Sequence, residues 1–326
     1  MRPDIFYLFL MAMLLLAAEL IYFRIATRFG IVDRPNDRSS HVSPAIRGGG
    51  IIFMVAVLLW YLQSNFSLYW LIGGTLAIAI ISFLDDVISM NPLIRFLVQL
   101  ISVLMMFHQL ELANWPVYLV VVAVIVCIGA LNAFNFMDGI NGITGVYALV
   151  SLVSFGCVHY FLIPFTDFSL LAVTLISVLI FLFFNFRNRA RCFAGDVGSV
   201  TIAYILIFFL LQLILATQNF LWPLFFLVYG TDSIVTIIYR IKRKENIFKA
   251  HRTHLFQYLS NELKWSHLGV SLLYGGVQLL INSILIFSLQ RHQILFPFIL
   301  TLFFLVVYFL TRFAVVRKIS QMKESQ

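Results

Sequence analysis

The sequence predicts an all-α, polytopic integral membrane protein, on the evidence of its composition, its continuous apolar runs and the placement of its charges. Of its 326 residues 62% are hydrophobic and only 11% are charged, and the mean hydropathy is +0.98. Such a chain has too few charges to cover a soluble surface of that size. The apolar runs are too long and continuous for barrel strands, which alternate in segments of about ten residues, so helices are expected.

Eleven apolar runs are candidate membrane spans, because most approach the roughly 20 residues that a span needs. The second and fourth are short, so ten spans with one re-entrant or interfacial segment is the alternative. The first run is expected to be an uncleaved span, because Arg2 precedes it while Arg24 and Arg28 follow, the reverse of a signal peptide. The runs cover residues 5–23, 48–62, 68–84, 93–107, 117–134, 143–163, 169–186, 198–216, 220–239, 268–289 and 294–311.

The basic residues predict how the helices are oriented. The N-terminus is placed outside and the C-terminus in the cytoplasm. In this orientation 20 of the 22 Lys and Arg residues fall on the cytoplasmic side, and only Arg2 and Arg291 lie outside. The net charge of +8 is therefore attributed to membrane topology and not to nucleic-acid binding. The connecting segments are too short for a second core, so residues 1–326 are expected to form one domain.

The segment NAFNFMDGING, residues 132–142, is a polar hinge between two apolar runs. Its amide and carboxyl groups should face a polar cavity, because they would be costly in lipid. Their spacing of three residues predicts one shared face on a helical turn. Oxygen ligands of this kind suit Mg²⁺ that also holds phosphates, although the amides equally suit a nucleobase edge, and a plain loop is the third alternative. These residues are Asn132, Asn135, Asp138 and Asn141.

Two other carboxylate sites lie at predicted span ends. Asp85 and Asp86 are adjacent, so they require a counter-cation or a retained proton. The pair suits a divalent metal or proton abstraction near a phosphate, or it merely terminates a span. Asp196 lies between glycines at a helix start, a setting for a metal-bound phosphate, or alternatively Asp196 and Ser199 are helix caps.

Cationic residues occur near the same predicted face. His251, Arg252 and His254 lie within four residues of one another and suit a pyrophosphate. No zinc site is predicted, because the three cysteines lack metal-ligand spacing. Arg47 precedes three glycines and is expected either to meet a phosphate or sugar hydroxyl or to anchor the membrane interface.

Two carboxylates are predicted inside spans, where a functional role is the default hypothesis. Asp232 is expected to support the site through Arg240 or another basic neighbour. Glu19 lies about one turn from Arg24, so an interfacial ion pair is expected there.

Five motifs occur in the same order as in one known family. They are SSHVSPAIRGGG, FLDD, NAFNFMDGING, FNFRNRARCFAGDVGS and FKAHRTHLFQYL. Together they resemble the polyprenyl-phosphate N-acetylhexosamine-1-phosphate transferases of glycosyltransferase family 4, over nearly the whole chain. That family includes the phospho-MurNAc-pentapeptide transferase of peptidoglycan synthesis and the GlcNAc-1-phosphate transferases that initiate O-antigen.

The resemblance implies a transferase in the inner membrane of a bacterium, with a periplasmic N-terminus and an active site on the cytoplasmic face. The lipid phosphate of undecaprenyl phosphate attacks the β-phosphorus of a UDP-N-acetylhexosamine, which gives an undecaprenyl-diphospho-sugar and UMP. The implied cofactor is Mg²⁺, with Mn²⁺ as an alternative. The implied partners are these two substrates, membrane lipid and, in a homodimer, a second copy of the chain, with no nucleic acid.

The resemblance also implies residue roles at the reacting groups. Asp196 and Asn135 correspond to the metal ligands. Asp85 and Asp86 correspond to the pair at the lipid phosphate, and Asp85 is the candidate that deprotonates or orients it. The motifs leave open whether attack is direct or proceeds through a covalent intermediate.

Other implied roles concern the nucleotide sugar. Phe193 matches the aromatic residue that stacks on uracil, and Asn185 and Asn141 match its polar uridine contacts. Asp138 matches the family's inner carboxylate, and Arg252 and His254 fall on its basic motif near the pyrophosphate, where His254 is a catalytic candidate together with Asp85, Asp86 and Asp196. His251 and Arg47 are further substrate-binding candidates.

The sequence departs from the family at Phe256 and Gln257, where many relatives carry further histidines. This departure favours the branch that initiates O-antigen or capsule over the peptidoglycan enzyme. The rival class is a transporter or flippase for a lipid-linked sugar, which predicts polar groups near the bilayer midplane and a site open to both faces. The almost chargeless extracellular segments disfavour that class, and a purely structural scaffold leaves the clustered Asp and Asn residues unexplained.

Overall fold

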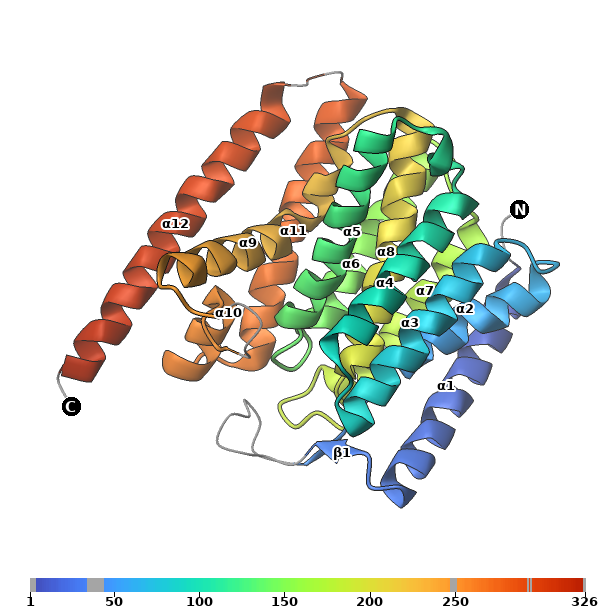
Figure 1. Cartoon of the computed structure of the whole chain (residues 1–326), viewed down its shortest axis with the longest axis horizontal. Coiled ribbons are helices and arrows are strands. Elements are labelled where there is room, and N and C mark those ends of the chain that lie inside the picture. Colours follow the sequence, from blue (N-terminus) through green and yellow to red (C-terminus); the bar gives the residue numbers. More distant parts are fainter. Residues whose placement is uncertain (1–3, 34–43, 247–250, 292, 294, 325–326) are drawn as a thin grey trace.

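The computed structural model describes residues 4–33, 44–246, 251–291, 293 and 295–324 as a bundle of helices (Figure 1). Within these residues, ten helices are long and apolar enough to span a membrane, and one apolar helix, α2, is shorter. The predicted all-α, polytopic fold is therefore confirmed. The fourth run, expected to be short, forms the 18-residue helix α4. The long helices are α1 (Ile5–Arg28), α3 (Tyr69–Ile88), α4 (Pro92–Gln109), α5 (Val117–Met137), α6 (Ile143–Phe161), α7 (Phe168–Asn185), α8 (Gly195–Thr217), α9 (Leu227–Lys242, preceded by η2, Trp222–Phe226), α11 (His267–Gln290) and α12 (Leu295–Glu324).

Short elements lie between these helices. The helix α2 (Ile51–Gln63) has 13 residues, too few to cross a bilayer at 1.5 Å per residue. The segment after α9 contains α10 (Leu255–Gln257) and η3 (Tyr258–Glu262), and η1 (Leu112–Asn114) precedes α5. The two-residue strands β1 (Val32–Asp33) and β2 (Ala45–Ile46) pair antiparallel and were not predicted.

We call one end of the bundle the site end: there α3, α5, α7 and α9 end and α4, α6, α8 and α11 begin. In Figure 1 the strand β1, the loops after α5 and α7 and the helix α10 all lie toward this end. Hence loops that are far apart in the sequence converge.

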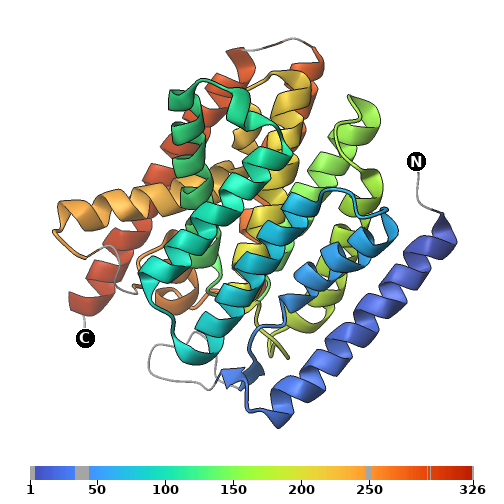
Figure 2. The same cartoon turned by 45° about the vertical axis from the view of Figure 1, so that its right-hand side comes forward.

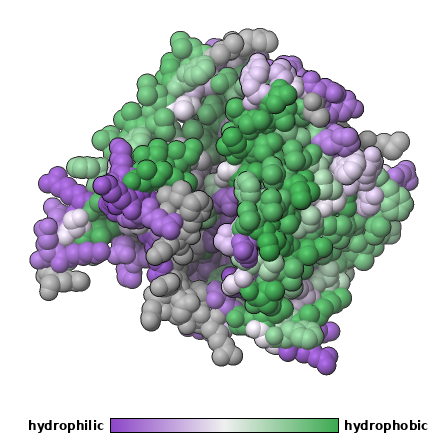
Figure 3. Space-filling view, viewed as in Figure 1, coloured by the Kyte–Doolittle hydropathy of each residue, from purple (hydrophilic) through white to green (hydrophobic). Residues whose placement is uncertain are grey.

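The helix α8 is the core of the bundle. In the apolar 18-residue stretch of α8, 72% of the residues are buried, whereas in the corresponding stretches of α5 and α12 only 17% are. Protein therefore encloses α8, while α5 and α12 present an outer surface. Figure 2 shows α8 behind α3 and α4, and hydrophobic side chains cover the outer face over these helices in Figure 3. Such a surface suits lipid contact.

Close backbone contacts fix the start of α8 against its neighbours. The Ile46 N–H donates to the Arg191 carbonyl at 3.0 Å, and the Phe193 N–H donates to the Ile46 carbonyl at 2.8 Å. A Cβ on Gly50 would lie 2.2 Å from the Cα of Gly198, so α2 and α8 approach closely only because both positions are glycine.

The helix α9 lies across the bundle at a steep angle to its neighbours in both cartoon views. It leads into the segment 251–262, which packs between α9, α11 and α12. Hydrophilic side chains gather where α9 and α12 end, on the left of Figure 3.

Candidate active site

The first turn of α8 is held by a carboxylate from α3. Asp86 Oδ1 accepts the Asp196 N–H at 3.1 Å, and Oδ2 accepts the Val197 N–H at 3.0 Å. The side chain of Asp86 is fully buried, and Arg47 Nε lies 2.9 Å from Oδ1. A negative charge here stabilises the partial positive charge of the helix N-terminus. Gly195 has φ +70°, and a Cβ there would lie 2.5 Å from Asp86 Oδ2, so the turn requires glycine.

The helix is therefore capped by Asp86, and the alternative in which Asp196 and Ser199 are the caps is wrong. No side-chain cap bond is formed at the Ala194 N-cap. The carboxylate of Asp196 is left to face the site, with 24% of its side chain exposed.

Arg95, in the first turn of α4, lies between two of the predicted carboxylates. Its Nη1 forms an ion pair with Asp85 Oδ2 and lies 3.7 Å from Asp196 Oδ2. Asp85 Oδ1 also accepts the Met90 N–H at 2.6 Å. The counter-cation that the adjacent carboxylates required is thus Arg47 for Asp86 and Arg95 for Asp85. Sequence reasoning missed Arg95, although it is the one basic residue near the start of the fourth apolar run.

The end of α5 is hydrogen-bonded to the start of α8. Asn135 Oδ1 accepts the Ser199 hydroxyl at 2.8 Å, and Ser199 lies about one helical turn beyond Asp196. Asn132, in contrast, donates to Gln99 Oε1 at 3.0 Å, away from the site. The expectation of one shared face is wrong, because α5 ends at Met137 and the rest of the hinge is not helical.

Asp138 follows α5 directly and accepts the Thr144 hydroxyl at 2.7 Å. The pKa of this carboxyl is raised to about 7, mainly by burial and in small part by the charge of Asp86, against the opposing effect of the Thr144 hydrogen bond. Asp138 therefore titrates near neutral pH.

Two amides predicted to contact uridine instead join the loops of the site. Asn185 Oδ1 accepts the Gly142 N–H at 2.8 Å, and its Nδ2 donates to the Cys192 carbonyl at 2.8 Å. Asn141 Nδ2 donates to the Arg187 carbonyl at 2.8 Å. Both side chains are buried. They fix the hinge against the loop that carries Phe193, whose side chain is partly buried.

We call residues 251–254 the basic segment. It contains one buried imidazole, that of His254, and one half-buried imidazole, that of His251. The rings of His251 and His254 stack with centroids 4.9 Å apart, and His254 Nδ1 lies 3.6 Å from Asp232 Oδ1. The pKa of His251 is lowered to about 4, first by burial and then by the charges of His254 and Arg240. His251 is therefore neutral at pH 7.

Arg252 supplies the cation of this segment. Its Nη2 is buried and has no hydrogen-bond partner among the residues that the structure describes. A buried guanidinium nitrogen without a partner is costly, so this group is suited to receive a phosphate oxygen.

Asp232 anchors the basic segment from α9. It accepts the Leu255 N–H at 3.0 Å and the hydroxyls of Tyr274 at 2.7 Å and Tyr308 at 3.0 Å. The predicted basic neighbour is Arg312 of α12, with Nη1 3.5 Å from Asp232 Oδ1. Arg240, the named candidate, instead lies 3.1 Å from Glu245 Oε2.

Glu19 does not form the interfacial pair expected with Arg24, and that prediction is wrong. Arg24 is exposed, whereas Glu19 is buried with Oε1 3.9 Å from the Cys192 sulfur. The face of α1 that carries Glu19 is turned toward the loop before α8.

The donor set at the site end fits magnesium better than zinc. Asp85 and Asp196 both face the guanidinium of Arg95. Asn135 accepts a hydrogen bond from Ser199, which lies about one turn after Asp196 in α8. Among the described residues no group of three or more His, Cys, Asp or Glu side chains could hold a metal ion. Mg²⁺ needs only one or two protein carboxylates when substrate phosphates and water complete its shell.

The fold and the site together define a multi-pass membrane protein that gathers carboxylate, amide and guanidinium groups at one end of its helix bundle. Residues 67–214 match the sequence model of glycosyl transferase family 4. The chain is also 28% identical over 255 residues to a protein of Bacillus subtilis (strain 168) named as a probable undecaprenyl-phosphate N-acetylglucosaminyl 1-phosphate transferase. That match covers 71% of this chain and 70% of the relative.

The match over residues 67–214 and the similarity to the Bacillus protein support the predicted family and a transferase activity. The rival prediction of a transporter is not supported. The matched range includes Asp85, Arg95, Asn135, Asp138 and Asp196 and ends before the basic segment.

Proposed function

We propose that this protein transfers N-acetylhexosamine-1-phosphate from a UDP-sugar to undecaprenyl phosphate, releasing UMP. The observation that carries the proposal is the pairing of Asp85 and Asp196 by one guanidinium, Arg95, at the site end. Carboxylates and cations interleaved in this way match a reaction that brings together two phosphate groups. The name of the Bacillus subtilis relative supports the same lipid acceptor and sugar class.

In the proposed reaction an oxygen of the lipid phosphate attacks the β-phosphorus of the nucleotide sugar. The new bond joins that oxygen to the β-phosphorus, the bond from the β-phosphorus to the bridging oxygen breaks, and UMP leaves with that oxygen. Such a transfer depends on positioning and charge neutralisation more than on covalent help. Asp85 orients the lipid phosphate and accepts its proton when it is protonated, while Arg95 balances the accumulated negative charge.

Asp196 and Asn135 would hold Mg²⁺, or Mn²⁺ as the alternative, and the ion would neutralise the charge on the diphosphate. Asp86 is a positioning residue in this proposal. It is fully buried, and its oxygens accept the N–H groups that place Asp196.

In this proposal groups from two segments bind the nucleotide sugar: residues 251–254 and the loop before α8 that carries Phe193. Arg252 binds the diphosphate, and neutral His251 contributes a hydrogen bond and not a charge. His254 orients this segment through Asp232. Phe193 stacks on the uracil.

Asn141 and Asn185 do not contact the nucleotide directly in this proposal. Their side-chain nitrogens donate to loop carbonyls, so they fix the shape of the nucleotide loop. Asp138 is the inner carboxylate, and Arg47 reaches the site edge with 42% of its side chain exposed.

The proposed location is the cytoplasmic face of a bacterial inner membrane. Almost all Lys and Arg residues are predicted on one side, and the site is on that side. A membrane lipid and a soluble nucleotide meet there without a soluble domain. Phe256 is fully buried where many relatives have histidine, which supports initiation of O-antigen or capsule over the peptidoglycan reaction.

The test is to incubate the purified protein with undecaprenyl phosphate and a panel of UDP-sugars, and to identify the lipid product by mass. The proposal expects UMP release that requires the lipid and one UDP-N-acetylhexosamine, with no product from the inserted Asp196→Asn variant. UMP release without the lipid, or full activity in that variant, contradicts it. A lipid product carrying phospho-MurNAc-pentapeptide would identify the peptidoglycan reaction instead.

A further inference from the structure

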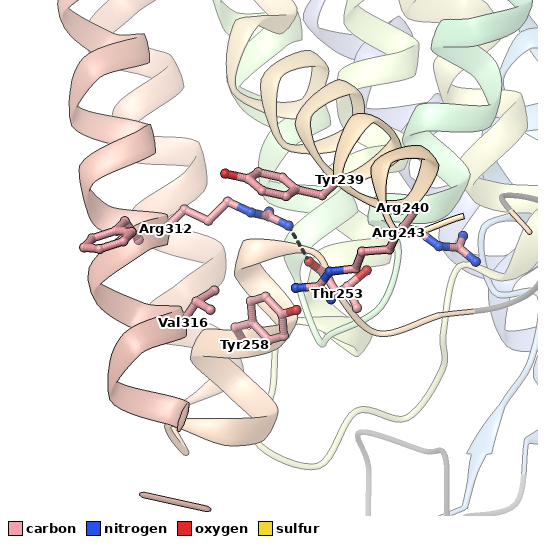
Figure 4. A pocket seen from close by; sticks show the side chains of 8 residues that line it. Tyr239, Arg240, Arg243, Thr253, Tyr258, Arg312 and Val316 are labelled. Atoms are coloured by element: carbon pink, nitrogen blue, oxygen red, sulfur yellow. Dashed lines mark hydrogen bonds between the residues drawn. The ribbon is translucent and has the colours of Figure 1, made fainter. Parts of the chain in front are cut away.

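A basic cavity apart from the candidate active site lies between the end of α9, the segment 251–258 and α12. Its volume is about 160 Å³, which is room for several waters or one phosphate group. Figure 4 shows its side chains converging from these three elements. The residues that define it are Tyr239, Arg240, Arg243, Thr253, Tyr258 and Arg312.

The charges of the cavity do not cancel. Arg240 is paired with Glu245, and Arg312 shares the buried Asp232. Arg243 is exposed and forms no ion pair among the residues that the structure describes. One positive charge is therefore left over for an anion.

The walls of the cavity are preorganised. The guanidinium carbon of Arg312 lies 5.2 Å from the ring centre of Tyr239 and 5.8 Å from that of Tyr258, so two aromatic faces hold it. Arg312 Nη2 donates to the Thr253 carbonyl at 2.9 Å, the bond drawn in Figure 4. Arg312 therefore has little side-chain entropy left to lose on binding.

The mouth of the cavity favours an amphiphile over a soluble anion. Phe313, which also lines it, is 69% exposed on the apolar outer surface of α12, and Tyr239 is 43% exposed. Arg243 also lines the cavity, at the polar end of α9. Tyrosine and arginine at the boundary between apolar and polar surface match the headgroup region of a bilayer.

We propose that this cavity binds the phosphate group of an anionic glycerophospholipid, whose acyl chains lie along α12. The site is separate from the transferase site, although Thr253 links the two, because it lies between Arg252 and His254. The proposal does not depend on the proposed reaction, and it is tested by binding alone.

The experiment is native mass spectrometry of the detergent-purified full chain titrated with phosphatidylglycerol or with phosphatidylcholine. We expect tighter binding of phosphatidylglycerol, a loss of at least about tenfold in its affinity in Arg243→Ala, and retention of most affinity in Arg243→Lys. The matched control is Lys242→Ala, which removes an exposed charge one residue away that does not line the cavity and should leave the affinity unchanged.

Three results would overturn the proposal. They are equal binding of the two phospholipids, equal losses in Arg243→Ala and Lys242→Ala, and displacement of phosphatidylglycerol by inorganic phosphate at the same concentration. Displacement by undecaprenyl phosphate that depends on Arg243 would also overturn it, because the cavity would then serve the substrate lipid.

Discussion

Replacing Asp86 with asparagine tests whether this carboxylate positions α8 or contacts substrate. The change keeps the size of the side chain but puts an amide NH₂ where an oxygen accepted hydrogen bonds. Oδ1 and Oδ2 now accept from Asp196 N–H, Val197 N–H and Arg47 Nε, so the amide nitrogen must face a donor. The variant therefore loses at least one contact and leaves a buried donor unsatisfied.

The magnitude follows from these contacts. A hydrogen bond to a charged group contributes about 1.5–3 kcal/mol. The Arg47 contact is discounted toward a surface ion pair, about 0–1 kcal/mol, because that side chain is 42% exposed. The expected loss is about 3 kcal/mol, mostly from the start of α8. A displacement of Asp196 by about 1 Å would lower the rate by about 100-fold.

The assay pairs thermal unfolding in detergent with UMP release. Asp86→Asn should lower the melting temperature by several degrees and also lower the rate. Asp85→Asn is the matched control: Asp85 pairs with Arg95 and accepts one backbone N–H, from Met90 in the loop before α4, but none at a helix N-terminus. It should therefore lose activity with a smaller loss of melting temperature. A variant of Asp86 with the wild-type melting temperature and no activity would refute the positioning role.

Three further predictions concern substrate binding and pH. Arg252→Ala should lower the rate at least about tenfold, because a charge-assisted hydrogen bond is worth about 1.5–3 kcal/mol. An unchanged rate would contradict binding of the diphosphate by Arg252. Phe193→Ala should raise the KM for the nucleotide sugar more than it lowers kcat, and an equal KM argues against stacking on uracil. Thr144→Val removes a hydrogen bond that lowers the pKa of Asp138, which is about 7, so the acid limb of the pH profile should move to higher pH. A limb that stays in place excludes ionised Asp138 from the activity.

The bundle was predictable because span length and hydropathy are local properties of the chain. The convergence of Asp85, Asn135 and Asp196 at one end followed from placing each polar segment between runs of known direction. The short helix α2 is the exception: its apolar run was counted as a span, yet the run begins with three glycines that precede the helix, and one of them, Gly50, packs against Gly198.

The missed features depend on which way a side chain faces. Arg95 and Arg312 looked like topology charges, since nothing local distinguishes a guanidinium that meets lipid headgroups from one paired with Asp85 or Asp232. Glu19 was given its nearest basic neighbour in the sequence, although the packing of α1 turns it toward Cys192.

The amides show the same limit. Asn141 and Asn185 were identified as belonging to the site, but their buried nitrogens bond loop carbonyls. Family motifs mark such residues without saying whether they touch substrate or hold the loops that do.

The central claim is that side chains from separate segments, Asn135 at the end of α5 and Asp196 at the start of α8, share one hydrated divalent ion. Electron paramagnetic resonance of bound Mn²⁺ tests it directly, without requiring activity. We predict one bound ion, competed by Mg²⁺, and a marked loss of affinity in either Asn135→Ala or Asp196→Asn, with no further loss in the double variant. Wild-type affinity in both single variants would contradict the account.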